Sequence, residues 1–174
     1  MEVGAAVIGP LINLCVWVKT NGGMGSLYRS QHELVCVFVR TGASHRNNVQ
    51  LGRYGRNRTN VWRYPGVNSF RAGRMEELRA HPTAKPVAMV KDALLDVTRR
   101  GDVVLDPFAG AGATLMAAER SGRCARLLEI DPLYVDVMLR RWREETGEDP
   151  VRERDGATLS ELETILQDRE SSDD

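Results

Sequence analysis

The chain has 174 residues, of which 42% are hydrophobic and 28% are charged, and its formal net charge is zero. This length suits a single domain with its own core. No apolar run approaches the roughly 20 residues of a membrane-spanning helix, so we expect a cytoplasmic protein without a membrane partner. The zero net charge hides an asymmetry, because residues 1–143 carry 21 Lys and Arg against 12 Asp and Glu, whereas residues 144–174 carry 3 against 12. A basic body with an acidic tail indicates a polyanionic partner for the body.

The first part of the chain predicts two strands. Residues 12–18 (INLCVWV) and 33–39 (ELVCVFV) are rich in Val, Leu and aromatic side chains, a composition typical of buried strands. We expect the apolar opening of the chain to be the buried lead-in to the first strand. From residue 41 to 74 the chain is polar, with Gly, Asn and Arg throughout, which predicts irregular structure with short strands at most.

The cysteines do not indicate a disulfide or a metal site. Cys15, Cys36 and Cys124 are odd in number, widely spaced and set among apolar residues. We therefore expect buried free thiols in a reducing compartment. Since His45 and His81 have no partners at metal-ligand spacing, no metal is expected.

The second half of the chain alternates helices and strands. Pro86 suits the first turn of a helix, and the apolar residues that follow it recur at helical spacing. In chain order the pattern predicts a helix from this point to Gly101, a strand at 102–106, a helix at 113–121, a strand at 125–129, a helix from Pro132 to near Gly147, and a short helix at 158–168 before a frayed end.

A glycine-rich turn follows the strand at 102–106, and an acidic residue ends the next strand. This is half of a nucleotide-binding α/β sheet, in which glycines let a ligand approach the backbone and the acid binds ribose hydroxyls. Glu129 lies 19 residues beyond Gly110, which matches that spacing. The turn lacks the third glycine of a dinucleotide fingerprint, and the chain has no GxxxxGK[ST] loop. A nucleoside without a pyrophosphate is therefore expected, and S-adenosylmethionine is the natural candidate.

Three segments resemble the β-class S-adenosylmethionine-dependent DNA amino-methyltransferases, which modify adenine N6 or cytosine N4. They are HPTAKP at 81–86, GDVVLDPFAGAGAT at 101–114 and LLEIDPLYVD at 127–136. Upstream segments between residues 13 and 66 resemble a subgroup of this family that is often fused to a ParB-like domain. The resemblance implies an α/β fold with a Rossmann-like class I methyltransferase sheet and helices on both faces. It also implies circular permutation, with the catalytic half before the cofactor half.

The resemblance also implies a cofactor site. Asp106 would lie near the methionine amino group, Glu129 would take the ribose hydroxyls, and Asp131 would either lie at the adenine end or simply cap a helix. Without a ligand, the glycines would form only a tight turn. The implied cofactor-binding residues are Thr83, Lys85, Asp106, Pro107, Phe108, Ala109, Gly110, Gly112, Glu129 and Asp131.

The catalytic motif of the family, [D/N/S]PP[Y/W/F], is missing from this sequence. Its polar side chain and prolyl carbonyl accept hydrogen bonds from the target amino group, and its aromatic ring stacks on the flipped base. The chain has seven prolines and no two are adjacent, so the catalytic residues are unknown, although His32 is a candidate pocket residue with an equally plausible structural role. We expect an N-terminally truncated domain, inactive as a fragment, with a second chain as a candidate source of the missing half. Either the two halves of the sheet pair directly, or two edges stay exposed.

The resemblance also implies how the chain divides into a domain and a tail. Residues 1–146 form a partial methyltransferase domain, in which 1–40 end the catalytic half, 41–80 are a basic target-recognition segment and 81–146 bind the cofactor. Residues 147–174 form an acidic tail, partly disordered. Within the basic segment seven arginines are expected to contact double-stranded DNA, unless they only form a solvated face. They are Arg46, Arg53, Arg56, Arg58, Arg63, Arg71 and Arg74.

The expected function is site-specific DNA methylation of the restriction-modification type, at adenine N6 in preference to cytosine N4. The alternative is a non-catalytic DNA- or cofactor-binding remnant, or the partner subunit of a split methyltransferase. An unrelated Rossmann oxidoreductase is disfavoured, because the glycine pattern is incomplete and HPTAKP has no role there.

Overall fold

The two strands predicted near the start of the chain pair with each other. β1 (Leu11–Val18) and β2 (His32–Phe38) are antiparallel, and β3 (Val61–Arg63) adds in parallel to the other side of β1, which gives the strand order β2-β1-β3. The structure is a computed structural model that describes residues 1–55, 57–66 and 85–171. No helix in this described part is long and apolar enough to cross a membrane.

The opening of the chain differs from its prediction. Instead of a buried lead-in, it forms α1 (Glu2–Val7), a short helix with no buried residue. Gly4 lies against the ring of Phe38, at the end of β2: a β-carbon on Gly4 would stand 2.5 Å from Phe38 Cζ. A contact with a residue 34 positions away therefore positions this helix, and local periodicity in the sequence does not predict such a contact.

A parallel strand pair forms the second sheet. β4 (Val103–Asp106) and β5 (Cys124–Leu127) pair in register along their length, and α4 (Ala113–Glu119) connects them. Met116 in α4 is fully buried, and α4 packs against both β5 and α3 (Val87–Val97). This strand–helix–strand unit is the one that the glycine-rich turn predicted.

One face of the β4–β5 pair is bare in the described part of the chain. Exposure alternates along both strands, and the exposed positions of β4 are apolar: Val103 is 63% exposed and Leu105 is 67% exposed. β4 also has β5 as its sole hydrogen-bonded neighbour among the described strands. Among the described strands the two halves of the sheet therefore do not pair directly, and of the two alternatives the one with exposed edges is observed there.

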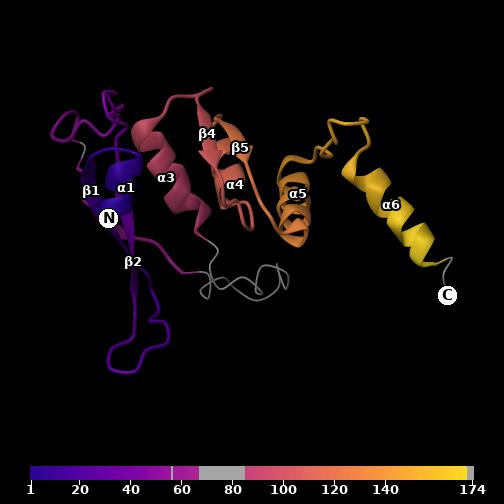
Figure 1. Cartoon of the computed structure of the whole chain (residues 1–174), viewed down its shortest axis with the longest axis horizontal. Helices are drawn as coiled ribbons and strands as arrows, with labels where there is room; N and C mark the ends of the chain where they lie inside the picture. Colours follow the sequence, from indigo (N-terminus) through magenta and orange to yellow (C-terminus); the bar gives the residue numbers. More distant parts are fainter. Residues whose placement is uncertain (56, 67–84, 172–174) are drawn as a thin grey trace.

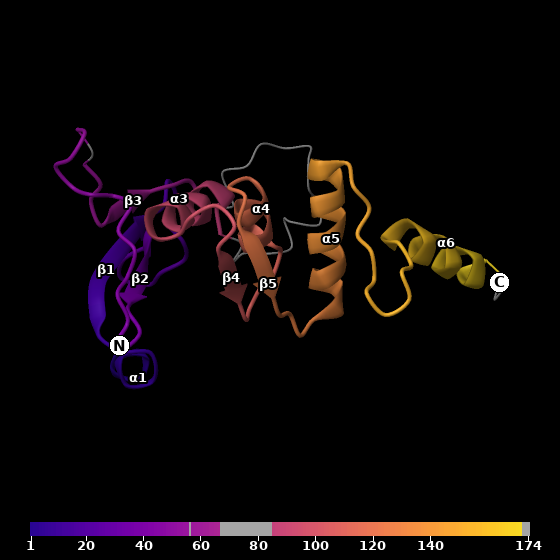
Figure 2. The same ribbon diagram turned by 90° about the horizontal axis from the view of Figure 1, so that it is seen from above.

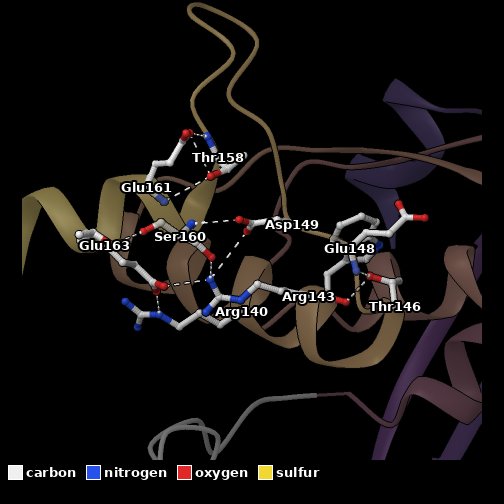
Figure 3. Close-up of polar contacts among 11 residues, drawn as sticks. Arg140, Arg143, Thr146, Glu148, Asp149, Thr158, Ser160, Glu161 and Glu163 are labelled. Atoms are coloured by element: carbon white, nitrogen blue, oxygen red, sulfur yellow. Dashed lines mark hydrogen bonds and ion pairs between the residues drawn. The ribbon is translucent and has the colours of Figure 1, made fainter.

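The C-terminal helices continue the molecule away from the sheets. α5 (Pro132–Thr146) carries Arg140 and Arg143, and both bond the Glu163 carboxylate of α6 (Leu159–Glu170), at 2.7 and 2.9 Å. Figure 3 shows Glu163 between the two guanidinium groups. The segment predicted as a partly disordered acidic tail therefore contains a tethered helix up to its last few residues.

A capping box begins α6. Thr158 accepts a hydrogen bond from the backbone N–H of Glu161, and the Glu161 carboxylate accepts one from the backbone N–H of Thr158 (Figure 3). These reciprocal bonds satisfy donors that the first turn of a helix leaves open. The sequence places this helix end at residue 158, which the structure confirms.

The elements form an elongated arrangement along the chain. In both views α3 lies between the first sheet and the β4–α4–β5 unit, with α5 and α6 following toward the C-terminus (Figures 1 and 2).

The three cysteines are free, as expected, but only Cys15 is buried, while Cys36 and Cys124 are exposed. The prediction of three buried thiols was wrong for these two, because apolar neighbours in a strand do not decide which of its faces is covered.

Candidate functional site

Asp106 organises the turn that follows β4. Its Oδ1 accepts a hydrogen bond from the backbone N–H of Phe108 at 3.0 Å, and its Oδ2 accepts one from the hydroxyl of Thr114 at 2.6 Å. One carboxylate thus joins the end of the strand to the first turn of α4. Thr114 was not predicted as a site residue, although a hydroxyl directly after the glycine turn was visible in the sequence.

The two predicted glycines differ in their surroundings. Both have positive φ, +51° at Gly110 and +77° at Gly112, a region that favours glycine. A β-carbon on Gly112 would stand 2.6 Å from Met138 Cγ on α5, whereas no atom lies within 4 Å of the corresponding position at Gly110. Gly112 therefore serves helix packing, and Gly110 leaves open space beside the backbone.

Glu129 links the two loops that follow β4 and β5. Its Oε2 accepts a hydrogen bond from the backbone N–H of Gly110 at 2.7 Å, and its Oε1 accepts from Ile130 and Asp131 at 2.9 and 3.0 Å. Hydrogen bonds to an ionised carboxylate are among the stronger ones in proteins. The acid predicted from its spacing is therefore held against the glycine turn by one backbone donor and oriented by two donors of its own loop.

Exposed apolar side chains belong to the same two loops as the glycine turn and Glu129. Phe108 is 86% exposed and Ile130 is 98% exposed, and a backbone bond of 3.0 Å from Ala109 to Leu128 holds their loops side by side. Two exposed apolar side chains on the loops that carry an acid and an open glycine suit a flat, partly apolar ligand with hydroxyl groups. Ile130 was not predicted, because a single apolar residue before Asp-Pro carries no sequence signal of exposure.

Asp131 caps α5. Its side chain accepts a hydrogen bond from the backbone N–H of Leu133 at 2.9 Å. Of the two roles left open by the sequence, the helix cap is the one that the structure confirms.

A half-buried cation supports the glycine turn. Arg141 of α5 donates to the carbonyl oxygen of Ala111 at 3.0 Å. Burial lowers the pKa of Arg141, and the charge of Arg120 lowers it further. This contact, between residues 30 positions apart, was not predictable from the sequence.

Lys85 belongs to a charged cluster around Trp17. Its ammonium pairs with Glu33 at 2.8 Å, Lys19 pairs with the other oxygen of Glu33 at 2.6 Å, and both lysines lie over the Trp17 ring, 5.0 to 5.6 Å from its centroid. Burial tends to raise the pKa of Glu33, but hydrogen bonds from the two lysines lower it below its usual value.

His32, the candidate pocket residue, begins β2 at an exposed position. Thr83 lies outside the described residues.

The two ends of helix α3 lie next to different predicted site residues. Lys85 precedes its first turn, whereas the side chain of Asn48 donates to the carbonyl oxygens of Leu95 and Thr98 at its last turn, both at 2.8 Å. Figure 1 shows β4 running back alongside α3, so the glycine turn after β4 lies at the Lys85 end. The part of the basic segment around Asn48 lies at the opposite end.

The structure gives Arg58 a packing role. Its guanidinium pairs with Asp96 of α3 at 2.5 Å and lies over the Trp62 ring, 5.3 Å from its centroid. Burial raises the pKa of Asp96 even though Arg58 and its hydrogen bond lower it. Both contacts lie within the fold, and a DNA contact at Arg58 stays a prediction.

The other predicted DNA-contacting arginines divide into two groups. Arg53 and Arg63 are exposed and Arg46 is half-buried. Arg56, Arg71 and Arg74 lie outside the described residues. Within the described ranges no group of three or more His, Cys, Asp or Glu side chains could hold a metal ion.

The chain matches the family model described as DNA methylase over residues 8–140. It is similar to the DNA adenine methyltransferase YhdJ of Escherichia coli (strain K12), with 43% identity over 82 residues that cover 47% of this chain and 26% of the relative. It is also similar to the type II methyltransferase M.HpaI of Haemophilus parainfluenzae, with 32% identity over 152 residues that cover 79% of this chain and 47% of the relative. The chain thus spans less than half the length of these two curated relatives.

Experimental structures share the fold. The PvuII DNA methyltransferase (cytosine-N4-specific) aligns with a TM-score of 0.64 and 18% identity, covering 79% of this chain and 53% of that one. The M1.HpyAVI–SAM complex aligns with a TM-score of 0.57 and 22% identity, covering 76% of this chain and 61% of that one. The likeness confirms the predicted Rossmann-like methyltransferase fold class.

Proposed function

The chain belongs to the DNA methylase family, and from that premise we propose that it binds S-adenosylmethionine at the glycine turn and takes part in methyl transfer to an amino group of DNA. The observation that carries the proposal is the bond between Gly110 and Glu129. It places a carboxylate beside an open backbone turn, which is the arrangement that nucleoside ligands use in this type of sheet.

The residues around this turn fit the proposed cofactor. Phe108 and Ile130 offer exposed apolar surfaces to the adenine ring, Glu129 offers carboxylate oxygens to the ribose hydroxyls, and Asp106 lies on the side proposed for the methionine amino group. A ribose at Glu129 would share or replace the bond from Gly110. When bound, S-adenosylmethionine supplies an activated methyl group, while this chain binds and orients it. Thr83 and Lys85 are proposed to close the pocket.

The amino group that receives the methyl group is proposed to be adenine N6. The adenine methyltransferase YhdJ supports this choice through its 43% identity, whereas the cytosine-N4-specific PvuII enzyme matches at 18% identity. Double-stranded DNA is the proposed substrate. The basic balance of residues 1–143 supports it, because Lys and Arg neutralise phosphates.

A second polypeptide segment is proposed to supply the acceptor for the target amino group. The 174 residues contain no adjacent prolines, so no [D/N/S]PP[Y/W/F] motif is present to hold that nitrogen. The bare face of the β4–β5 pair and the open side of β4 offer this segment an apolar surface and a row of backbone hydrogen-bonding groups. The alternative function, a cofactor- or DNA-binding subunit without its own chemistry, is favoured by the same missing motif.

Calorimetric titration of the purified chain with S-adenosylmethionine tests the proposal. We expect saturable binding that S-adenosylhomocysteine competes away, and weaker binding by the Glu129→Ala variant. Absence of binding by the parent chain would overturn the proposed cofactor site. Transfer of labelled methyl groups to DNA, measured with and without a separate polypeptide that carries the missing motif, distinguishes the enzyme from the non-catalytic subunit.

A further inference from the structure

The charged cluster around Trp17 joins the first sheet to the residues before α3 through one carboxylate. Glu33 lies on β2, and its two oxygens pair with Lys19 at 2.6 Å and with Lys85 at 2.8 Å. Lys85 belongs to HPTAKP, the segment that is proposed to close the cofactor pocket. We infer that Glu33 is a positioning residue of the cofactor site, which holds this segment in place through Lys85. The inference rests on the proposed function.

Strand alternation places Glu33, and not its neighbour His32, on the covered side of the first sheet. Successive side chains of a strand point to opposite faces. Along β2, His32 is exposed, whereas Glu33, Val35 and Val37 are half-buried. Glu33 also stands directly opposite Trp17 in the antiparallel register, and residues in that relationship share a face. Of the two neighbours, Glu33 is therefore the one that reaches Lys85.

Trp17 gives this ion pair a rigid support. Its side chain is only 2% exposed, its indole N–H donates to the carbonyl oxygen of Tyr64 at 3.0 Å, and β2 and β3 flank its backbone on both sides. The Lys85 ammonium lies over its ring, 5.6 Å from the centroid, where the π face attracts a cation. The first sheet thus holds this ammonium by two contacts, one with Glu33 and one with Trp17.

The place of Lys85 in the chain makes these contacts a constraint on the segment before α3. Lys85 directly precedes Pro86, which is buried and forms the N-cap of α3. The proline ring fixes one backbone dihedral of this residue. With Pro86 buried and Lys85 tied to β2, the end of HPTAKP is held on both its backbone and its side chain. Loss of the Glu33 carboxylate would release the side-chain part of this attachment.

A double-mutant cycle on cofactor affinity tests the inference. Calorimetry with S-adenosylmethionine compares the purified parent chain with Glu33→Gln, Lys85→Gln and the double variant. Ion pairs between partly exposed groups contribute modestly, so Glu33→Gln should weaken binding about two- to fivefold. Because Glu33 acts through Lys85, the double variant should bind no more weakly than Lys85→Gln alone, whereas independent effects would multiply. The matched control, Glu144→Gln, is exposed on α5 and should keep the parent affinity.

A shorter acid separates the charge of Glu33 from its packing. Glu33→Asp keeps the carboxylate, and the flexible stem of a lysine can follow it, so this variant should bind the cofactor like the parent. Circular dichroism melting of each variant checks that the fold is kept.

Three results would each overturn the inference while leaving the proposed function intact. They are parent affinity in Glu33→Gln, multiplied losses in the double variant, and binding by Glu33→Asp as weak as that by Glu33→Gln. Absence of binding by the parent chain would instead overturn the proposed function, and this inference with it.

Discussion

The backbone N–H of Gly110 donates a hydrogen bond of 2.7 Å to Oε2 of Glu129, 19 positions away. This bond joins the loop after β4 to the loop after β5, and it does so at a glycine whose open side has no neighbouring atom within 4 Å. The carboxylate therefore shapes the turn at which we propose that the cofactor binds. A substitution at either residue should affect the loop and the ligand together.

Glu129→Gln should weaken S-adenosylmethionine binding by about ten- to a hundredfold, because charge-assisted hydrogen bonds contribute about 1.5–3 kcal/mol each. The amide keeps the shape of the side chain but removes its charge and one acceptor. Calorimetry gives the affinity, and Glu144→Gln, an exposed position on α5, is the matched control. Equal affinity in the Glu129 variant and the parent would remove Glu129 from the cofactor site.

Gly110→Ala and Gly112→Ala should have different effects. Gly112→Ala combines strain at φ +77° with a β-carbon 2.6 Å from Met138 Cγ, so we expect a clear drop in melting temperature. Gly110→Ala adds strain of about 1 kcal/mol at an open position and should reduce cofactor affinity more than stability. Gly156→Ala, at φ +75° with no atom within 4 Å, controls for strain alone. If Gly110→Ala left cofactor binding unchanged, the turn would not contact a ligand.

Arg58→Ala should destabilise the fold and not merely weaken DNA binding. The substitution leaves the Asp96 carboxylate without its ion-pair partner and removes the cation from the Trp62 ring, which should lower the free energy of unfolding by about 1–3 kcal/mol. Chemical denaturation measures this loss, and Arg53→Ala in the same segment should cost less than about 0.5 kcal/mol. Equal stability of the two variants would contradict the packing role of Arg58.

Attachment of α6 to α5 should depend on pH through Glu163. Hydrogen bonds from Arg140 and then Arg143 lower the pKa of Glu163 below its usual value of 4.5. A lowered pKa means that the contact is fully present above pH 4.5 and is lost as the pH falls through the lowered value. Chemical shifts of the α6 amides, followed from neutral to acidic pH, should report this release. Glu163→Gln should show the released shifts already at neutral pH, while Glu153→Gln in the exposed preceding loop should not.

The bare face of β4 should be needed for methyl transfer but not for cofactor binding. The chain alone is expected to transfer no labelled methyl group to DNA, because its 174 residues contain no [D/N/S]PP[Y/W/F] motif to hold the target nitrogen. Activity restored by a second polypeptide carrying [D/N/S]PP[Y/W/F] should be lost in Val103→Lys/Leu105→Lys, where two charges replace exposed apolar residues. Leu51→Lys, also at an exposed position, should keep the restored activity. Turnover by the purified chain alone would show that the chemistry uses other residues.

Local pattern determined most of the elements by itself. The strands β1, β2, β4 and β5 and the helices α3, α4 and α5 lie where apolar periodicity and helix-end residues predict them, since both signals come from neighbours within a few positions. The same holds for the turn at Gly110 and the acid at Glu129, whose spacing reflects one strand–helix–strand unit.

Only the tertiary structure decided which partner each side chain takes. The bond from Arg141 to Ala111 spans 30 positions. The Arg58–Asp96 pair joins a loop to a helix, so Arg58 became part of the packing while Arg53, in the same basic segment, stays exposed. The exposure of Cys36, Cys124 and Leu105 likewise depends on which face of a strand another element covers. Periodicity specifies that a strand has two faces, but the packing of distant segments determines which face is buried.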